Sequence, residues 1–176
     1  MKVVWESGPL EESDKHHIEA AEGWLHLGDW EEGRKEILSV SPAARAHPEV
    51  VRVMLQFMMA RQQWQAVAEG GLVLCLIAPQ SPDGWFYRAA ALGGMERITE
   101  ARDLLLGVVD RFPGVFQLYY LLAAFCCRLD DLKEGRRWWK KAVACYESTE
   151  LKDRALEDPG LKKLFCVSGN AEKLKR

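Results

Sequence analysis

The sequence lacks the long apolar runs and the one-signed charge that identify several common classes of protein. No stretch of its 176 residues approaches the roughly 18 consecutive apolar residues of a membrane-spanning helix. The N-terminal MKVVWESGPLEESD has no apolar core and turns acidic, so we expect no secretory signal. A formal net charge of −2 provides no basic field for nucleic acid or an anionic membrane. These absences favour a cytoplasmic protein that does not bind membranes.

The usual motifs of metal binding and catalysis are also missing. The five cysteines lie within apolar stretches and show no CxxC spacing, which favours reduced, buried thiols over disulfides or a metal site. The four histidines have no carboxylates at a zinc-binding spacing, and neither a GxSxG context nor a glycine-rich phosphate loop occurs. We therefore predict a non-enzymatic protein with no catalytic residue, metal or cofactor.

What is present is a pattern of large and small residues that returns every 34 residues. Bulky residues recur at the turn between two paired helices, namely Trp30, Trp64, Ile98 and Leu132. Alanine recurs where the first helix of a pair must pass close to its neighbour, at Ala21, Ala89 and Ala123, with Leu55 at the remaining place. A second series of mostly small residues stands three residues after the turn, at Gly33, Val67, Ala101 and Gly135. Pro79 and Pro113 end two of the pairs, since proline cannot continue a helix. The pattern predicts an all-α protein in which helix pairs stack.

These positions resemble the tetratricopeptide repeat (TPR), a 34-residue helix–turn–helix unit. The third unit matches best, with the pattern falling on Trp85, Ala89, Leu92, Ala101, Leu105, Val108 and Pro113. The resemblance covers about residues 14 to 147, and the later sequence LEDPGLKKLF is similar to the closing segment of a group of bacterial TPR proteins. It implies a right-handed α-solenoid of about four TPR-like repeats with a C-terminal capping segment.

The second unit departs from the TPR pattern at two places. Leu55 stands in a small-residue place, and Gly71 stands in a large one. We interpret Gly71 as leaving room for a neighbouring tryptophan, either Trp64 or Trp85.

The predicted organisation has four repeat units between a lead-in and a cap. Residues 1–12 form an extended lead-in, and the repeat domain spans 13–147 with units at about 14–47, 48–81, 82–114 and 115–147. Ser13 or Asp14 is the expected N-cap of the first helix. A stack of helix pairs leaves its last apolar face open, so we expect residues 148–168 to form capping helices. Residues 169–176 are expected to be a frayed tail.

Two sets of residues follow from the repeat. The first defines the core of the repeats and comprises Ala21, Trp24, Trp30, Trp64, Trp85, Ala89, Ala101, Ala123 and Trp139. In TPR proteins the first helix of each unit lines a concave face that usually carries binding. The resemblance therefore implies a partner-binding groove at Arg52, Gln56, Met59, Phe86, Tyr87 and Tyr120. The alternative is that these aromatic residues are ordinary core, or are covered by the terminal segments.

We predict an interaction scaffold that binds a peptide or a partner protein, of unknown identity, in this groove. One subgroup of TPR proteins grips a C-terminal carboxylate with asparagines, but Val53, Tyr87 and Leu121 occupy those places here. A self-assembly module, such as a homodimer formed through an open face near Trp5 or Phe165, stays open as an alternative.

A small-molecule-binding or RNA-binding repeat protein is the less favoured alternative. Bases could stack on Trp138 within the basic run KEGRRWWKKA. However, Trp139 falls on a core place of the repeat, and the acidic residues Asp130, Asp131 and Glu134 dilute the charge. The sequence therefore disfavours nucleic acid as the partner.

Overall fold

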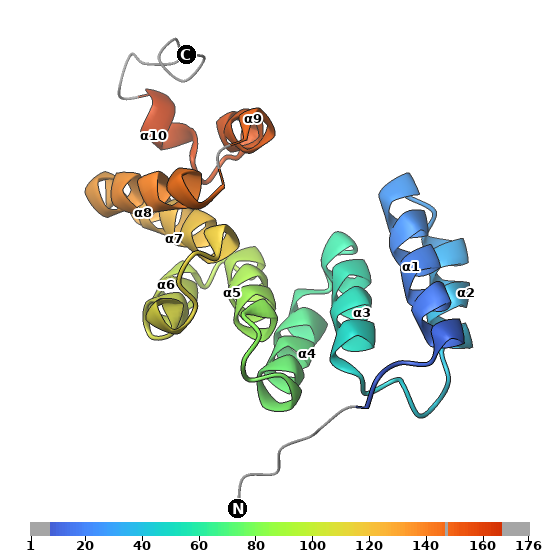
Figure 1. Ribbon diagram of the computed structural model, residues 1–176. Helices are drawn as coiled ribbons and strands as arrows, with labels where there is room; N and C mark the ends of the chain where they lie inside the picture. Colours follow the sequence, from blue (N-terminus) through green and yellow to red (C-terminus); the bar gives the residue numbers. More distant parts are fainter. Residues whose placement is uncertain (1–7, 147, 167–176) are drawn as a thin grey trace, which may run out of the picture. The chain divides into compact units, whose positions relative to one another are not determined.

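The computed structural model describes residues 8–146 and 148–166, and in these residues it contains α-helices and one short 3-10 helix but no strand (Figure 1). The predicted all-α class is confirmed. The helices are α1 (Glu12–Leu27), α2 (Trp30–Ser39), α3 (Pro48–Ala60), α4 (Trp64–Ile77), α5 (Asp83–Gly94), α6 (Ile98–Leu106), η1 (Val109–Arg111), α7 (Phe116–Arg128), α8 (Leu132–Cys145), α9 (Thr149–Glu157) and α10 (Lys162–Cys166). Most of the predicted lead-in, including Trp5, and the predicted frayed tail lie outside the described residues.

The chain forms two compact units whose boundary falls within α5, between Ala91 and Leu92. In unit 1, α1 packs on α2, α3 packs on α4, and α1 also contacts α3. In unit 2, α7 packs along α8 and against α6, while α10 contacts both α8 and α9. Each unit is therefore built from helices that are neighbours in the sequence.

A left-handed residue recurs in the turn within each of the four repeat units. Gly28, Gln62, Glu96 and Asp130 have φ angles of 77°, 57°, 62° and 62°, and they are spaced 34 residues apart. Each stands two residues before the bulky residue that begins the second helix. In two of the turns an aspartate, Asp29 or Asp131, then accepts a hydrogen bond from the backbone N–H three residues later, at 3.2 and 3.1 Å. The turn geometry repeats although its residue types do not.

The residues that define the repeat differ widely in their burial. Ala21, Ala89, Ala101 and Ala123 are fully buried, as close helix contact requires. Trp139 is also buried, and it packs edge-on to Phe165 with 5.7 Å between ring centroids. Trp24, Trp64 and Trp85 are half-buried. Trp30 is 36% exposed and contacts Phe57 edge-on.

Helices α4 and α5 approach so closely that neither Gly71 nor Gly84 has room for a Cβ atom. A Cβ at Gly84 would lie 2.6 Å from the backbone N of Cys75 and 2.9 Å from the carbonyl O of Gly71. A Cβ at Gly71 would lie 2.7 Å from Cγ of Arg88. The space that Gly71 leaves is therefore occupied by Arg88 and the Gly84 backbone, and not by the tryptophan that we expected.

The third helix pair ends in a 3-10 turn and not in a longer second helix. Helix α6 ends at Leu106 and is followed by the 3-10 turn η1. Val108 and Val109 are both buried. The tighter turn brings these two consecutive apolar side chains inward just before Pro113.

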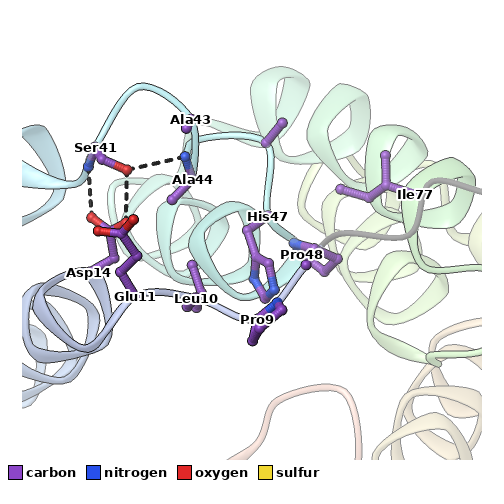
Figure 2. Close-up of a pocket in the computed structure, with 12 residues that line it drawn as sticks. Pro9, Leu10, Glu11, Asp14, Ser41, Ala43, Ala44, His47, Pro48 and Ile77 are labelled. Carbon is purple, nitrogen blue, oxygen red and sulfur yellow. Dashed lines mark hydrogen bonds between the residues drawn. The ribbon is translucent and has the colours of Figure 1, made fainter.

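Neither Ser13 nor Asp14 caps α1, because the helix begins at Glu12 and its N-cap position is Glu11. The carboxylate of Asp14 instead binds the connection between α2 and α3 (Figure 2). It is only 2% exposed, and its two oxygens accept hydrogen bonds from the backbone N–H and the hydroxyl of Ser41, both at 2.8 Å. The Ser41 hydroxyl in turn accepts a hydrogen bond from the N–H of Ala44 at 3.3 Å. These hydrogen bonds lower the pKa of Asp14 below its ordinary value of 3.8.

We expect Asp14→Asn to lower the free energy of unfolding at pH 7, because a neutral amide cannot accept both Ser41 hydrogen bonds. A depressed carboxyl pKa stabilises the fold above the unfolded value of 3.8, and that contribution is lost as the pH falls through the folded value. The difference between wild type and variant should therefore shrink in urea titrations below about pH 4. Glu19→Gln, an exposed change on the same helix, is the control. A difference that does not depend on pH would contradict the assignment.

Gly84→Ala should destabilise the protein by about 1–3 kcal/mol, because the new methyl group meets backbone atoms that cannot move independently. Gly23→Ala is the matched control, since a Cβ there meets nothing within 4 Å. That second change should stabilise α1 by about 0.5–1 kcal/mol through helix propensity. Thermal unfolding followed by circular dichroism compares the two variants. Equal melting temperatures would disprove the close approach of α4 and α5.

Candidate interaction site

The side chains of α1 and α3 meet through an ion pair on the face that the resemblance assigns to binding. Nη1 of Arg52 donates a hydrogen bond to Oε1 of Glu22 at 2.8 Å, and the two side chains are 28% and 29% exposed. Burial alone would lower the pKa of Arg52, but the hydrogen bond and the charge of Glu22 raise it. The pair is stable as an ion pair and still accessible to solvent.

Arg52 belongs to a stripe along α3 that continues with Gln56 and Met59. Their spacing of four and then three residues places all three on one side of the helix. Met59 and Phe86 are half-buried and pack against the same core cluster, which includes Leu55 and Tyr87. We call Glu22, Arg52, Gln56, Met59 and Phe86 the first-helix face of unit 1.

Tyr87 lies beneath this face and not on it. It is 4% exposed, and its ring contacts Phe86 edge-on with 5.3 Å between centroids. Burial raises the pKa of Tyr87 to about 12, although the nearby Arg52 and a hydrogen bond with Gln56 act in the opposite direction. Tyr87 therefore stays a neutral phenol at physiological pH and supports the stripe on α3 from below.

A small pocket of about 210 Å³ opens beside Arg52. It is bounded by the beginnings of α3 and α5 and by the end of α4, and its lining includes Pro48, Leu74, Ser81 and Asp83. Asp83 is held by Ser81, whose hydroxyl donates to the carboxylate at 2.9 Å. The pocket thus combines apolar side chains with Arg52 and two acidic residues, Glu49 and Asp83.

Tyr120, the sixth predicted groove residue, lies in unit 2. It forms a hydrogen bond with the segment between α9 and α10. Its hydroxyl donates to Oδ2 of Asp158 at 2.6 Å, and Oδ1 of the same aspartate accepts from the N–H of Gly160 at 2.7 Å. Burial and this hydrogen bond raise the pKa of Tyr120. Leu161 and Leu164, which follow, are buried. Tyr120 therefore fits the alternative given above, in which a terminal segment covers the predicted groove residues.

The other candidate groups in the sequence have structural partners. Trp138 and Trp139 are both buried, and Nζ of Lys141 lies 4.2 Å from the centroid of the Trp138 ring, so Trp138 offers no free face for a base. Nδ1 of His17 lies 2.7 Å from a carboxylate oxygen of Glu36. Within the described ranges no group of three His, Cys, Asp or Glu side chains could hold a metal ion. None of the described helices combines the length and apolarity that crossing a membrane requires.

The ion pair and the tyrosine–aspartate bond were not predicted from the sequence. Glu22 and Arg52 are 30 residues apart, and Tyr120 and Asp158 are 38 apart. Both separations are close to one 34-residue repeat, so each partner lies about one repeat further along the chain. A search for complementary polar residues about one repeat apart would have included Glu22 and Arg52, which both lie within the repeats, whereas Asp158 follows the last repeat.

Comparison with known proteins identifies the fold of the chain but not its biochemical role. No family profile and no curated protein sequence matches the chain. Among solved structures, a thermophilic TPR protein of Thermus thermophilus is similar with a TM-score of 0.74 and 14% identity, covering 92% of this chain and 86% of that one. MamA (41–end) of Desulfovibrio magneticus RS-1 is similar with a TM-score of 0.66 and 18% identity, covering 96% and 98%. These similarities show that the chain has the TPR fold.

We expect Tyr120→Phe to loosen the C-terminal segment by about 1–2 kcal/mol, because Asp158 then loses a hydrogen bond to its charged carboxylate. Amide hydrogen exchange should become faster in α9 and α10 and remain unchanged in α3. Tyr146→Phe is the control, since Tyr146 is 46% exposed and its ring stacks on Phe116. Equal exchange in the two variants would show that the Asp158 bond does not hold the segment.

Proposed function

We propose that this protein is a non-enzymatic cytoplasmic scaffold that binds a segment of another protein on the first-helix face of unit 1. The observation that carries the proposal is the partly exposed Arg52–Glu22 pair beside the apolar side chains of Met59 and Phe86. Arginine and aromatic side chains are the usual anchors of protein interfaces. The TPR fold, found in the structural comparison, is typical of interaction scaffolds.

Binding would proceed by exchange of carboxylates on Arg52. A partner carboxylate takes the place of Glu22, while apolar side chains next to it cover Met59 and Phe86. The cost of breaking the internal pair is small, because both side chains already contact water. An acidic residue adjacent to apolar residues is therefore the sequence feature that this face selects.

The two buried thiols, Cys126 and Cys127, support a passive, non-catalytic role. Cys75, Cys126, Cys127 and Cys145 form no disulfides. Burial raises the pKa of Cys126 to about 11 and that of Cys127 to about 12, so both are protonated and weakly nucleophilic. These are the properties of packing residues in a cytosolic protein.

Affinity capture from the lysate of the source cells tests the proposal. A protein retained by the wild type should be lost from Arg52→Ala/Phe86→Ala and retained by Arg97→Ala. Arg97 is the matched control because it also pairs with a glutamate, Glu100, but lies in unit 2. With the captured segment as a synthetic peptide, we expect the double variant to weaken binding at least tenfold.

Glu22→Gln tests whether the partner's carboxylate replaces Glu22 on Arg52 or the partner binds the intact Arg52–Glu22 pair. Without the competing carboxylate, Arg52 is free for the partner, so affinity should rise by about two- to fivefold. A fall in affinity would mean that the partner binds the intact ion pair. Equal binding by wild type and Arg52→Ala/Phe86→Ala would overturn the assignment of this face.

A further inference from the structure

Among the described residues, most of the exposed large apolar side chains belong to unit 1. Among the described residues, six of the eight large hydrophobic residues classed as exposed belong to this unit: Leu27, Trp30, Leu38, Leu72, Val73 and Leu76. They gather at two places, one around α2 and one on α4. Exposed apolar patches of this kind mark interaction surfaces.

The first place is a cleft of about 220 Å³ between α2 and α3. Its apolar lining comes from Trp30, Ile37, Leu38, Met54, Phe57 and Met58. Arg34 and Arg61 also line it, and both are exposed. Neither guanidinium has a carboxylate partner among the described residues. We call this surface the α2–α3 cleft.

The second place is a ridge on the outer side of α4. Leu72, Val73 and Leu76 are 47%, 45% and 66% exposed, and Glu69 is exposed one turn before them. The spacing of three and four residues places all four on one helical face. The Glu69 carboxylate accepts a hydrogen bond from Gln65 at 2.8 Å but has no cationic partner among the described residues. We call these four residues the α4 ridge.

We propose that the α4 ridge of one molecule docks into the α2–α3 cleft of a second copy of this chain. The surfaces are complementary in form, since one is a helical ridge and the other a cleft between helices. They are complementary in chemistry, since Leu72 and Leu76 match an apolar lining that is rich in methionine. They are complementary in charge, since Glu69 meets Arg34 and Arg61.

Because cleft and ridge are different surfaces of the same unit, one contact leaves the ridge of one copy and the cleft of the other unoccupied. Such a contact either closes into a ring or continues along an open chain of molecules. It uses neither Arg52 nor Phe86, so the first-helix face of unit 1 stays free to bind its partner. A ridge of few side chains implies weak association, with a dissociation constant on the order of 10–100 µM.

Two complementary variants test the docking by analytical ultracentrifugation at concentrations up to about 300 µM. The cleft variant is Arg34→Glu/Arg61→Glu, and the ridge variant is Leu72→Ser/Leu76→Ser. Wild type should rise above the 20.0 kDa of one chain as its concentration increases, whereas each variant alone should remain at that mass. An equimolar mixture should form a dimer and nothing larger, because only one ridge and one cleft in each pair are intact.

Charge reversal provides a rescue. Adding Glu69→Arg to the cleft variant restores opposite charges across the contact, and self-association should return to within about fivefold of wild type. All substituted side chains are exposed, so circular dichroism should show unchanged helicity. Arg52→Ala should associate like wild type, which separates this contact from the proposed partner site.

Two results would overturn the docking proposal. Wild type could remain at the mass of one chain throughout the concentration range, in which case the two apolar surfaces serve a different protein. Alternatively, the cleft and ridge variants could associate as wild type does, in which case another surface joins the molecules. Neither result bears on peptide binding at Arg52.

Discussion

The close approach of neighbouring helices is the constraint on which the rest of this structure depends. Ala21, Ala89, Ala101 and Ala123 are fully buried, and neither Gly71 of α4 nor Gly84 of α5 has room for a Cβ atom. Helices that pass this closely present their remaining side chains in fixed rows. That geometry places Arg52 of α3 against Glu22 of α1, and it holds Tyr87 of α5 beneath Gln56.

Much of the fold could be predicted from the sequence, because the repeat pattern expresses this same constraint. Small residues at a 34-residue spacing require tight contacts at a 34-residue spacing, and bulky residues mark the turns between them. The left-handed backbone of the turns could not be predicted, since Gln62 and Glu96 carry no preference for it. Similarly, the pattern identified Gly71 as unusual but could not show that a backbone and Arg88 fill the space beside it.

The sequence predicted which residues of the candidate site lie near one another. It predicted less well which of them are exposed and which are buried or bonded. The repeat register placed Arg52, Gln56 and Tyr87 near one another, because the first helices of successive units are neighbours. It could not separate Phe86, which is half-buried, from Tyr87, which is buried, since adjacent residues of a helix differ by only about 100°. Nor could it show that Asp158 engages Tyr120, because that bond depends on a segment outside the repeats.

Hydrogen exchange of the protein with and without its bound partner tests the central claim most directly. If the first-helix face of unit 1 is the binding surface, the partner should slow exchange in α1, α3 and the beginning of α5. Exchange in α2, α4 and unit 2 should change little. Protection confined to α2 and α4, or to α7 and α8, would contradict the account.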